Sequence, residues 1–192
     1  MNGTVDRQGA PRLIIILVIV AIALTVGAIV TGFVIAARVT AEQSAPQTGP
    51  LAVPAAPAPG ETGRYCSQLM PLLPHDLSGS PRRELIAGTP GQAAWGDPAI
   101  ILRCGLSDPA ELTCAAPLTK FTGAGGTSVE WLRTASDTSV TYLVVDRPVR
   151  IAVTVPDSAG IGPVQQLSDL IGATLPARDV CSGSGVLPAD NS

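Results

Sequence analysis

The only histidine of the chain, His75, is the first residue to consider for chemistry. A Ser-His-Asp or Cys-His site would need it as the general base. It stands between Pro74 and Asp76, in a loop after a predicted helix, and such a histidine is typical of a solvated or turn-capping residue. The sequence contains no Gly-x-Ser-x-Gly or Ser-x-x-Lys motif, so it lacks the nucleophiles that these motifs supply.

Carboxylates are the second candidate for catalysis. Fourteen Asp and Glu residues follow Val39, which is enough to include a glycosidase pair, but their spacing singles out no two of them. Scattered surface acids explain them equally well. We therefore predict no catalytic residues, no cofactor and no enzymatic activity.

All four cysteines follow the long apolar run near the N-terminus. An even number of cysteines in an exported domain favours two disulfides. A metal site would need closely spaced cysteines or several histidines, and the sequence has no Cys-x-x-Cys, so we predict no metal. Buried free thiols remain the alternative. Four cysteines allow three pairings, and spacing alone does not choose among Cys66, Cys104, Cys114 and Cys181.

The two tryptophans each adjoin a predicted strand. Packing in the core is the ordinary role of such residues, but an indole can also stack on a ligand. We therefore take Trp95, Arg103 and Trp131 as a candidate ligand or partner surface. The glycine-rich residues 123–126 lack the lysine and the strand-to-helix context of a phosphate loop, so we expect a hairpin turn there.

Composition limits the class of protein that could carry these residues. The 192 residues have a formal net charge of −3 and only 3% aromatic side chains. Without a basic stripe or a base-stacking platform, we expect no nucleic-acid binding. One long apolar run rules out a polytopic transporter, and the chain left after it is short for a large enzyme.

The apolar run covers residues 13–37, without a charge or a proline. A helix of this length spans the hydrocarbon core of a bilayer with some tilt. Arg7 and Arg12 precede it and Arg38 follows it. We therefore expect residues 1–12 in the cytoplasm and everything after Arg38 outside the cell membrane. A signal peptide cleaved after Ala41 is the alternative, although its apolar region is usually shorter.

Residues 38–63 follow as a proline- and alanine-rich linker, which we expect to be an extended spacer. The folded extracytoplasmic domain should cover residues 64–181, and residues 182–192 should form a flexible tail. We predict an α+β fold, with a small antiparallel sheet packed against N-terminal and C-terminal helices.

The elements of this domain follow from local patterns. Residues 65–73 are predicted as a short helix, Ser80 and Pro81 open a second, and residues 163–175 form a final amphipathic helix. Strands are predicted at residues 99–104, 128–133 and 140–145, the last one central. Residues 149–155 alternate in polarity and indicate a one-sided strand, joined by a tight hairpin at Asp146 and Arg147, with Pro148 on an edge.

Several of these segments together resemble the actinobacterial DUF3515 family of membrane or secreted proteins of unknown function. The resemblance covers residues 65–176, except that the turn at residues 123–128 looks expanded and Cys114 and Cys181 look like additions. It is carried above all by the segment AWGDPAIILRCG at residues 94–105. The other matching residues are Cys66, Leu69, Leu73-Pro74, Val129-Glu130-Trp131, Asp146-Arg147-Pro148-Val149, Val155-Pro156 and residues 167–171.

This resemblance implies an anchored or exported domain in which Cys66 pairs with Cys104, and that leaves Cys114 for Cys181. It implies no activity and no catalytic residue. We therefore expect a single-pass cell-envelope protein whose outer domain binds a partner, either an envelope protein or a cell-wall component. A small-ligand or lipid-binding exported domain is the alternative.

Overall fold

A computed structural model describes residues 9–43, 49–123, 125–183, 185–190 and 192 of the chain. The predicted cytoplasmic head therefore lies mostly outside the described residues. The chain divides into two units, residues 1–46 and residues 47–192, and each is described by itself.

The first unit is a single long helix, α1 (Gly9–Gln43). Its segment Ile15–Gly32 has a mean hydropathy of 2.8, and the large apolar side chains of this segment are exposed on all sides of the helix. Thr25 and Thr31 turn their hydroxyls back to helix carbonyls, those of Ala21 and Gly27 among them. A helix that is apolar all round and satisfies its own polar groups is suited to cross a membrane, which makes it a candidate span.

The second unit is built on one antiparallel sheet of eight strands, whose spatial order is β2-β3-β5-β6-β10-β9-β8-β7. Two meanders make up this sheet, and they meet where β6 pairs with β10. The α+β prediction is confirmed. The strands are β2 (Asp76–Leu77), β3 (Ser80–Arg83), β5 (Gln92–Trp95), β6 (Ile100–Leu106), β7 (Leu118–Thr122), β8 (Ser128–Ala135), β9 (Ser139–Val144) and β10 (Arg150–Pro156).

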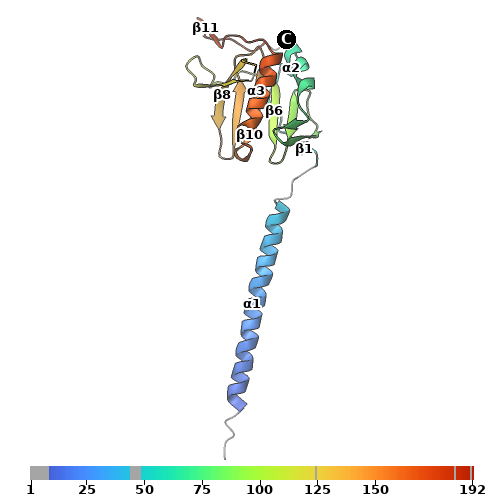
Figure 1. Cartoon of the computed structure of the whole chain (residues 1–192), viewed down its shortest axis with the longest axis vertical. Helices are drawn as coiled ribbons and strands as arrows, with labels where there is room; N and C mark the ends of the chain where they lie inside the picture. The colour runs from blue at the N-terminus through green and yellow to red at the C-terminus, as the bar shows by residue number, and fades with distance from the viewer. Residues whose placement is uncertain (1–8, 44–48, 124, 184, 191) are drawn as a thin grey trace, which may run out of the picture. The chain divides into compact units, whose positions relative to one another are not determined.

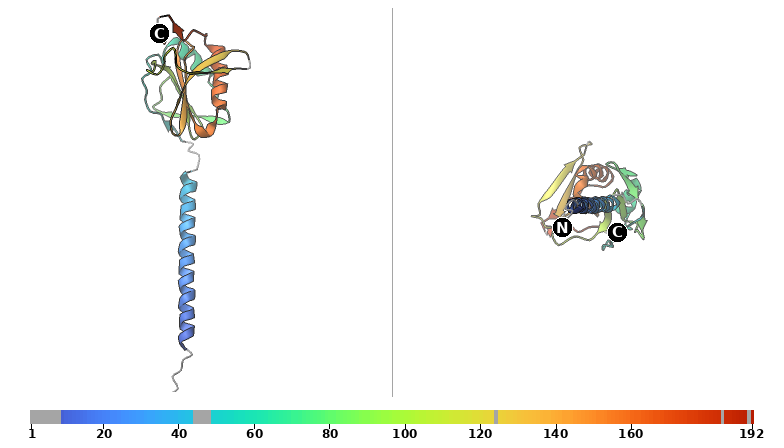
Figure 2. Two further views of the ribbon diagram at one scale, coloured as in Figure 1. Left: turned by 90° about the vertical axis from the view of Figure 1, so that its left-hand side faces the viewer. Right: turned by 90° about the horizontal axis from the view of Figure 1, so that it is seen from below.

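Helices cover one face of this sheet, which we call the helix face. The α3 helix (Gly162–Thr174) crosses it in front of β10 and β6 (Figure 1), and a side view shows α3 on one side of the strands (Figure 2). The α2 helix (Arg64–Leu69) and the 3-10 turn η1 (Met70–Leu72) lie where the sequence predicts a helix, and a second turn, η2 (Asp157–Ala159), precedes α3. The main core lies between the helices and the sheet.

Two local predictions are wrong. Ser80 and Pro81 begin the strand β3, not a helix, because β3 pairs on both sides, with β2 and with β5. Residues 149–155 are predicted to form a one-sided strand with Pro148 on an edge, but β10 lies between β6 and β9. Its second face is covered too, since Arg150 is fully buried and Ala152 is only 6% exposed.

The proline-rich segment also differs from the prediction. Residues 49–63, which we call the strap, belong to the folded unit and lie along it. Within the strap, β1 (Leu51–Ala52) pairs in parallel with β4 (Leu85–Ile86), and Arg83 donates a hydrogen bond to the Gly49 carbonyl. Only residues 44–48 of the predicted spacer separate α1 from the strap, and these lie outside the described residues.

The predicted flexible tail is likewise part of the fold where the structure describes it. A small hairpin joins β11 (Cys181–Ser182) to β12 (Gly185–Val186). The Asp190 amide donates to the Pro148 carbonyl at 2.7 Å, and the Arg64 amide donates to the Ser192 carbonyl at 3.1 Å. These backbone bonds tie the residues after β12 to the β9–β10 connection and to α2.

Candidate functional site

The surface predicted from Trp95, Arg103 and Trp131 does not form. Both indoles are fully buried on the helix face. The Trp95 Nε1 donates to the Pro74 carbonyl at 2.9 Å, and the Trp131 Nε1 donates to the Ser168 hydroxyl at 3.0 Å. Arg103 alternates with the buried Leu102 and Cys104 of β6 and therefore points to the opposite face. These tryptophans are core residues, because neither ring has a surface left for a ligand.

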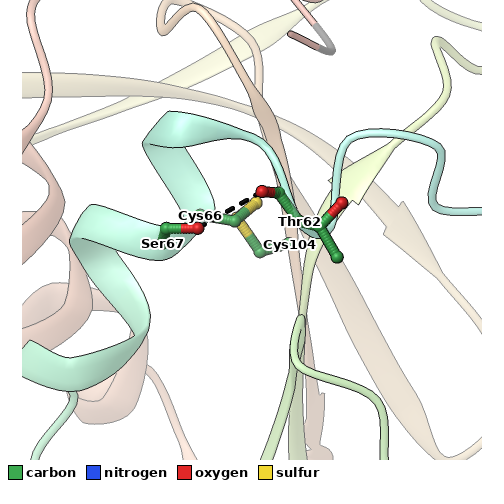
Figure 3. The surroundings of a disulfide bond; sticks show 4 residues. All are labelled: Thr62, Cys66, Ser67 and Cys104. Carbon is green, nitrogen blue, oxygen red and sulfur yellow. Dashed lines mark hydrogen bonds between the residues drawn. A yellow bond between two sulfur atoms is a disulfide. The ribbon is translucent and has the colours of Figure 1, made fainter.

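The structure contains both disulfides of the expected framework, Cys66–Cys104 and Cys114–Cys181. The first is fully buried and joins α2 to the central strand β6. Beside it the Ser67 hydroxyl donates to the Thr62 carbonyl at 3.3 Å (Figure 3). The second lies nearer to the surface and joins the segment after β6 to β11. The first bond therefore fastens the helix layer to the sheet, and the second joins two segments outside the eight-stranded sheet to each other.

Two residues of β6, Arg103 and Gly105, hold the strap, and Cys104 between them holds α2. The Arg103 Nη2 donates to the Pro54 carbonyl at 3.2 Å, and Cys104 carries the disulfide. Gly105, at φ +85°, accepts from the Gly60 amide at 3.0 Å. A Cβ on Gly105 would lie 2.2 Å from the Glu61 amide nitrogen, so only glycine lets the strap come this close. The Arg-Cys-Gly segment thus has a physical role: its arginine and glycine fasten the strap, and its cysteine fastens α2.

Arg150 is the most highly connected side chain on the strap side of the sheet, which we call the strap face. It is fully buried. Its Nε lies 2.6 Å from the Asp108 carboxylate, and its other nitrogens donate to the carbonyls of Val145 at 2.8 Å and Leu187 at 2.7 Å. One guanidinium therefore joins the loop after β6, the β9–β10 connection and the residues after β12.

Arg147 is buried as completely, beside Asp146 in the β9–β10 connection. Its Nη1 lies 2.8 Å from the Asp146 Oδ2, and its Nη2 donates to the Ser128 carbonyl at 2.8 Å. Among the described residues, the Asp146 Oδ1 and the Arg147 Nε find no hydrogen-bond partner. Burial raises the pKa of Asp146, and the nearby Glu130 carboxylate adds to this rise, although Arg147 opposes it.

Sequence reasoning missed these two arginines, since it treated Asp146 and Arg147 as a simple hairpin turn. A signal was present, because three charged residues interrupt a strongly apolar stretch of the second unit, residues 140–155. Charges are rarely buried unless they are paired. Charged residues within a strongly apolar stretch therefore indicate buried, paired side chains.

A polar cavity of about 370 Å³ lies beside the Cys114–Cys181 disulfide. Side chains of both signs line it, among them Lys120, Glu130, Asp146 and Arg178, and Lys120 pairs with Glu130 at 3.0 Å. Three carboxylates therefore line the cavity, those of Glu130, Asp146 and Asp179, which their spacing in the sequence did not single out. The Asp146 Oδ1 is closed to solvent, however, so in this conformation that oxygen cannot reach a substrate.

An apolar groove of about 480 Å³ opens on the strap face, and we call it the sheet groove. Four neighbouring strands supply its floor, Ala56 and Pro57 of the strap form one wall, and Asp108 and Glu111 lie at its rim. No lysine or arginine is among its lining residues. The side chains of the floor are Leu106, Leu132, Leu143 and Ala152.

The groove can accept apolar groups, because its floor is apolar and one of its floor leucines, Leu106, is only partly buried. Leu132 and Leu143 are each 7% exposed, and Thr134 and Thr141 add hydroxyls beside them. Its volume lies within the range of about 300–1,000 Å³ that is usual for ligand sites. Over the described part of the chain, no three His, Cys, Asp or Glu side chains come together as a metal site would require.

Comparison with known proteins gives one match. No curated protein and no solved structure matches the chain. A family model described as "Protein of unknown function (DUF3515)" matches residues 18–180, which include most of the apolar segment, the strap and the whole eight-stranded sheet. Because this match covers most of its length, the chain belongs to the DUF3515 family.

Proposed function

We propose that this chain is a membrane-anchored cell-envelope protein whose outer unit binds another protein. Two features support the location. The Ile15–Gly32 segment has the length and hydropathy of a membrane span. Two disulfides are typical of an oxidising compartment outside the cytoplasm. We place residues 1–12 in the cytoplasm and residues 47–192 outside.

The observation that carries the binding role is the sheet groove. Concave sites with an apolar lining and a few polar groups are where proteins usually bind a partner or ligand, and here the strap and the loop after β6 border the groove without closing it. The occupant we propose is an apolar side-chain cluster of a partner protein, flanked by a lysine or arginine. The Glu111 carboxylate at the groove would face that positive charge, whereas Asp108 is already paired with Arg150.

A lipid-binding role is the second candidate, because the groove volume also suits an acyl chain. The charges of the rim count against it. An anionic lipid headgroup would lie beside Glu111, with no lysine or arginine among the lining residues to neutralise it. Like charges brought together at an interface cost free energy, so we prefer a protein partner.

Topology can be tested on whole cells. A thiol-reactive, membrane-impermeant label should reach a single cysteine placed at Gly49 in a variant whose four native cysteines are replaced by alanine. The same label should not reach a cysteine placed at Gly3. Labelling of Gly3→Cys without labelling of Gly49→Cys would overturn the proposed orientation.

Occupancy of the groove can be tested with a photo-crosslinking residue at Thr134, an exposed position in its lining. We expect one defined protein adduct in intact cells, and none from the same residue at Ala173, which is exposed on α3. Thr134→Glu should remove binding of the purified adduct partner, and Ala173→Glu should leave it unchanged. Co-purification of a stoichiometric lipid that Thr134→Glu displaces would favour the second candidate instead.

A further inference from the structure

The two edges of the eight-stranded sheet differ in how they end. At one edge β2 has only two residues, and the side chain of Gln166 covers it. The Gln166 Oε1 accepts from the Ser78 amide at 2.9 Å, and its Nε2 donates to the Asp76 carbonyl at 3.4 Å. At the other edge β7 has five residues, Leu118–Thr122, and pairs only with β8.

The hydrogen-bond alternation shows which groups of β7 face outward. The Gly123 amide donates to the Thr127 carbonyl at 2.8 Å. In an antiparallel pair, every second residue of a strand bonds to the same neighbouring strand, and the residues between them point their amides and carbonyls away from it. Independently, the Glu130 carbonyl accepts from Val145 on the β9 side, so its opposite residue Lys120 cannot bond to it. The residues whose amides and carbonyls point away from β8 are therefore Leu118, Lys120 and Thr122.

Nothing else in the described part of the chain bonds to these outward backbone groups. Natural proteins often protect such an edge with a lysine that projects over it. Here the Lys120 ammonium is turned back onto the Glu130 carboxylate, 3.0 Å away. The edge is thus long enough and open enough to take another strand.

A cavity lies beside β7 on each face of the sheet. On the strap face, Leu118 and Lys120 line the polar cavity next to the Cys114–Cys181 disulfide. On the helix face, Phe121 lines a second cavity of about 330 Å³ against Gln165 and Asp169 of α3, and Lys120 and Thr122 also border this cavity at the edge of the sheet. Since side chains of a strand alternate between faces, a strand added to β7 would present side chains to both cavities in turn.

We propose that β7 is a docking edge for an extended segment of a different protein, which joins the sheet as a ninth strand. The residue of this segment opposite Lys120 is a glutamate or aspartate, which continues the charge alternation that Lys120 and Glu130 begin. Backbone pairing supplies the affinity in this mode of recognition, and the alternating side chains supply the specificity. The inference rests on the outer unit being a binding module, but it does not need the sheet groove.

Charge decides against a second copy of this chain as the occupant. An antiparallel pairing of two β7 strands that uses all three outward residues of each places Lys120 directly opposite Lys120 of the other copy. Like charges in this position destabilise a pair of strands. A partner segment with a carboxylate at that place has the opposite effect.

The test uses the full chain, labelled with ¹⁵N in detergent micelles, and a synthetic seven-residue peptide of alternating threonine and valine with a central glutamate. We expect the peptide to slow amide exchange at Leu118, Lys120 and Thr122 by about fivefold each, the effect of a hydrogen bond of typical net strength. A peptide with a central lysine should give less protection. Equal protection by both peptides, or none by either, would overturn the proposal.

Two variants separate strand pairing from charge. Lys120→Pro removes an outward amide and no bond to β8, so binding of the glutamate peptide should be lost. In the absence of peptide, the amides of β8 should keep the exchange rates that they have in the unmodified chain. Lys120→Thr retains the amide and should bind both peptides equally and weakly. If Lys120→Pro perturbs β8, Thr122→Pro at the strand end serves in its place. Binding of the glutamate peptide to both proline variants would overturn the proposal.

The groove and the edge can fail separately. Thr134→Glu alters the sheet groove and should leave peptide protection at β7 unchanged. Loss of the peptide effect with an intact Thr134 adduct in cells would overturn the docking edge and keep the proposed function. Loss of the Thr134 adduct with an intact peptide effect would overturn binding in the groove and keep the docking edge. Dimerisation of the unmodified chain through β7 would overturn the assignment of the partner.

Discussion

The helix face and the strap face of the sheet are closed by different forces. On the helix face, α2 and α3 bury a continuous apolar core in which Trp95, Trp131 and Leu167 are fully enclosed. On the strap face, a smaller cluster around Leu143 and Val145 is covered by irregular segments. These segments are held by guanidinium groups, backbone bonds and a disulfide.

This difference has a functional consequence. A helix that packs by apolar burial leaves little space over the core beneath it, because any gap in a core loses free energy. Segments held at a few polar points, such as the Pro54 carbonyl and the Asp108 carboxylate, can leave space between those points. The sheet groove lies in such a space, so the more polar construction is what leaves room for a partner.

The largest effect should come from the helix face. Trp131→Ala removes a fully buried indole and should lower the free energy of unfolding by about 3–5 kcal/mol. Urea unfolding of the full chain in detergent, followed by circular dichroism, measures it. Trp131→Phe, which keeps most of the buried ring, should cost clearly less. A loss below about 1 kcal/mol would mean that the face is not a packed core.

The next effect tests the strap face. Arg150→Met should lower the free energy of unfolding by about 3 kcal/mol, because a carboxylate and buried carbonyls lose their donor. The same substitution at Arg133, which is exposed on β8, should change it by less than about 0.5 kcal/mol. Equal unfolding curves for the two variants would contradict the assigned role of Arg150.

A smaller effect is expected at the strap itself. Gly105→Ala places a Cβ in a left-handed backbone position against Glu61, at a cost of about 2 kcal/mol. Hydrogen exchange should become faster over residues 51–61 while α3 stays protected. Gly183→Ala, where the added Cβ meets nothing within 4 Å, is the control. Equally faster exchange in residues 51–61 and in α3 would show that the strap does not open independently of the helix face.

The smallest effect concerns pH. Burial raises the pKa of Asp146 above its ordinary value of 3.8, so the folded protein holds this proton more tightly than the unfolded chain. The associated stability is complete below pH 3.8 and is lost as pH rises through the raised pKa. Unfolding of Asp146→Asn should lack this decline. An identical pH dependence in both proteins would place the titration elsewhere.

The sequence was informative where apolar periodicity is the cause of structure. The helix at Gly162–Thr174 and the strand at Ile100–Leu106 follow directly from spacing, since their buried side chains recur with the period of the element. By contrast, β5 was missed: Ala93 and Ala94 form half of it, and alanine gives little strand signal.

The strap and the buried arginines could not be read from composition. A run rich in proline and alanine predicts an extended chain, and the strap is extended, but what fixes it is a set of carbonyls aimed at Arg83 and Arg103. Hydropathy places every arginine on the surface, whereas Arg147 and Arg150 are the least accessible cations described. The candidate site was therefore misplaced onto two core tryptophans.

The Cys66–Cys104 bond also decides how the outer unit would respond to tension. A pull on its N-terminal end first meets the hydrogen bonds of the strap, which can open one after another up to Arg64. The next link is covalent and ends on Cys104 of β6, in the middle of the sheet. Mechanical load would then bypass the residues between these two cysteines, and the force would be shared by the strands on both sides of β6.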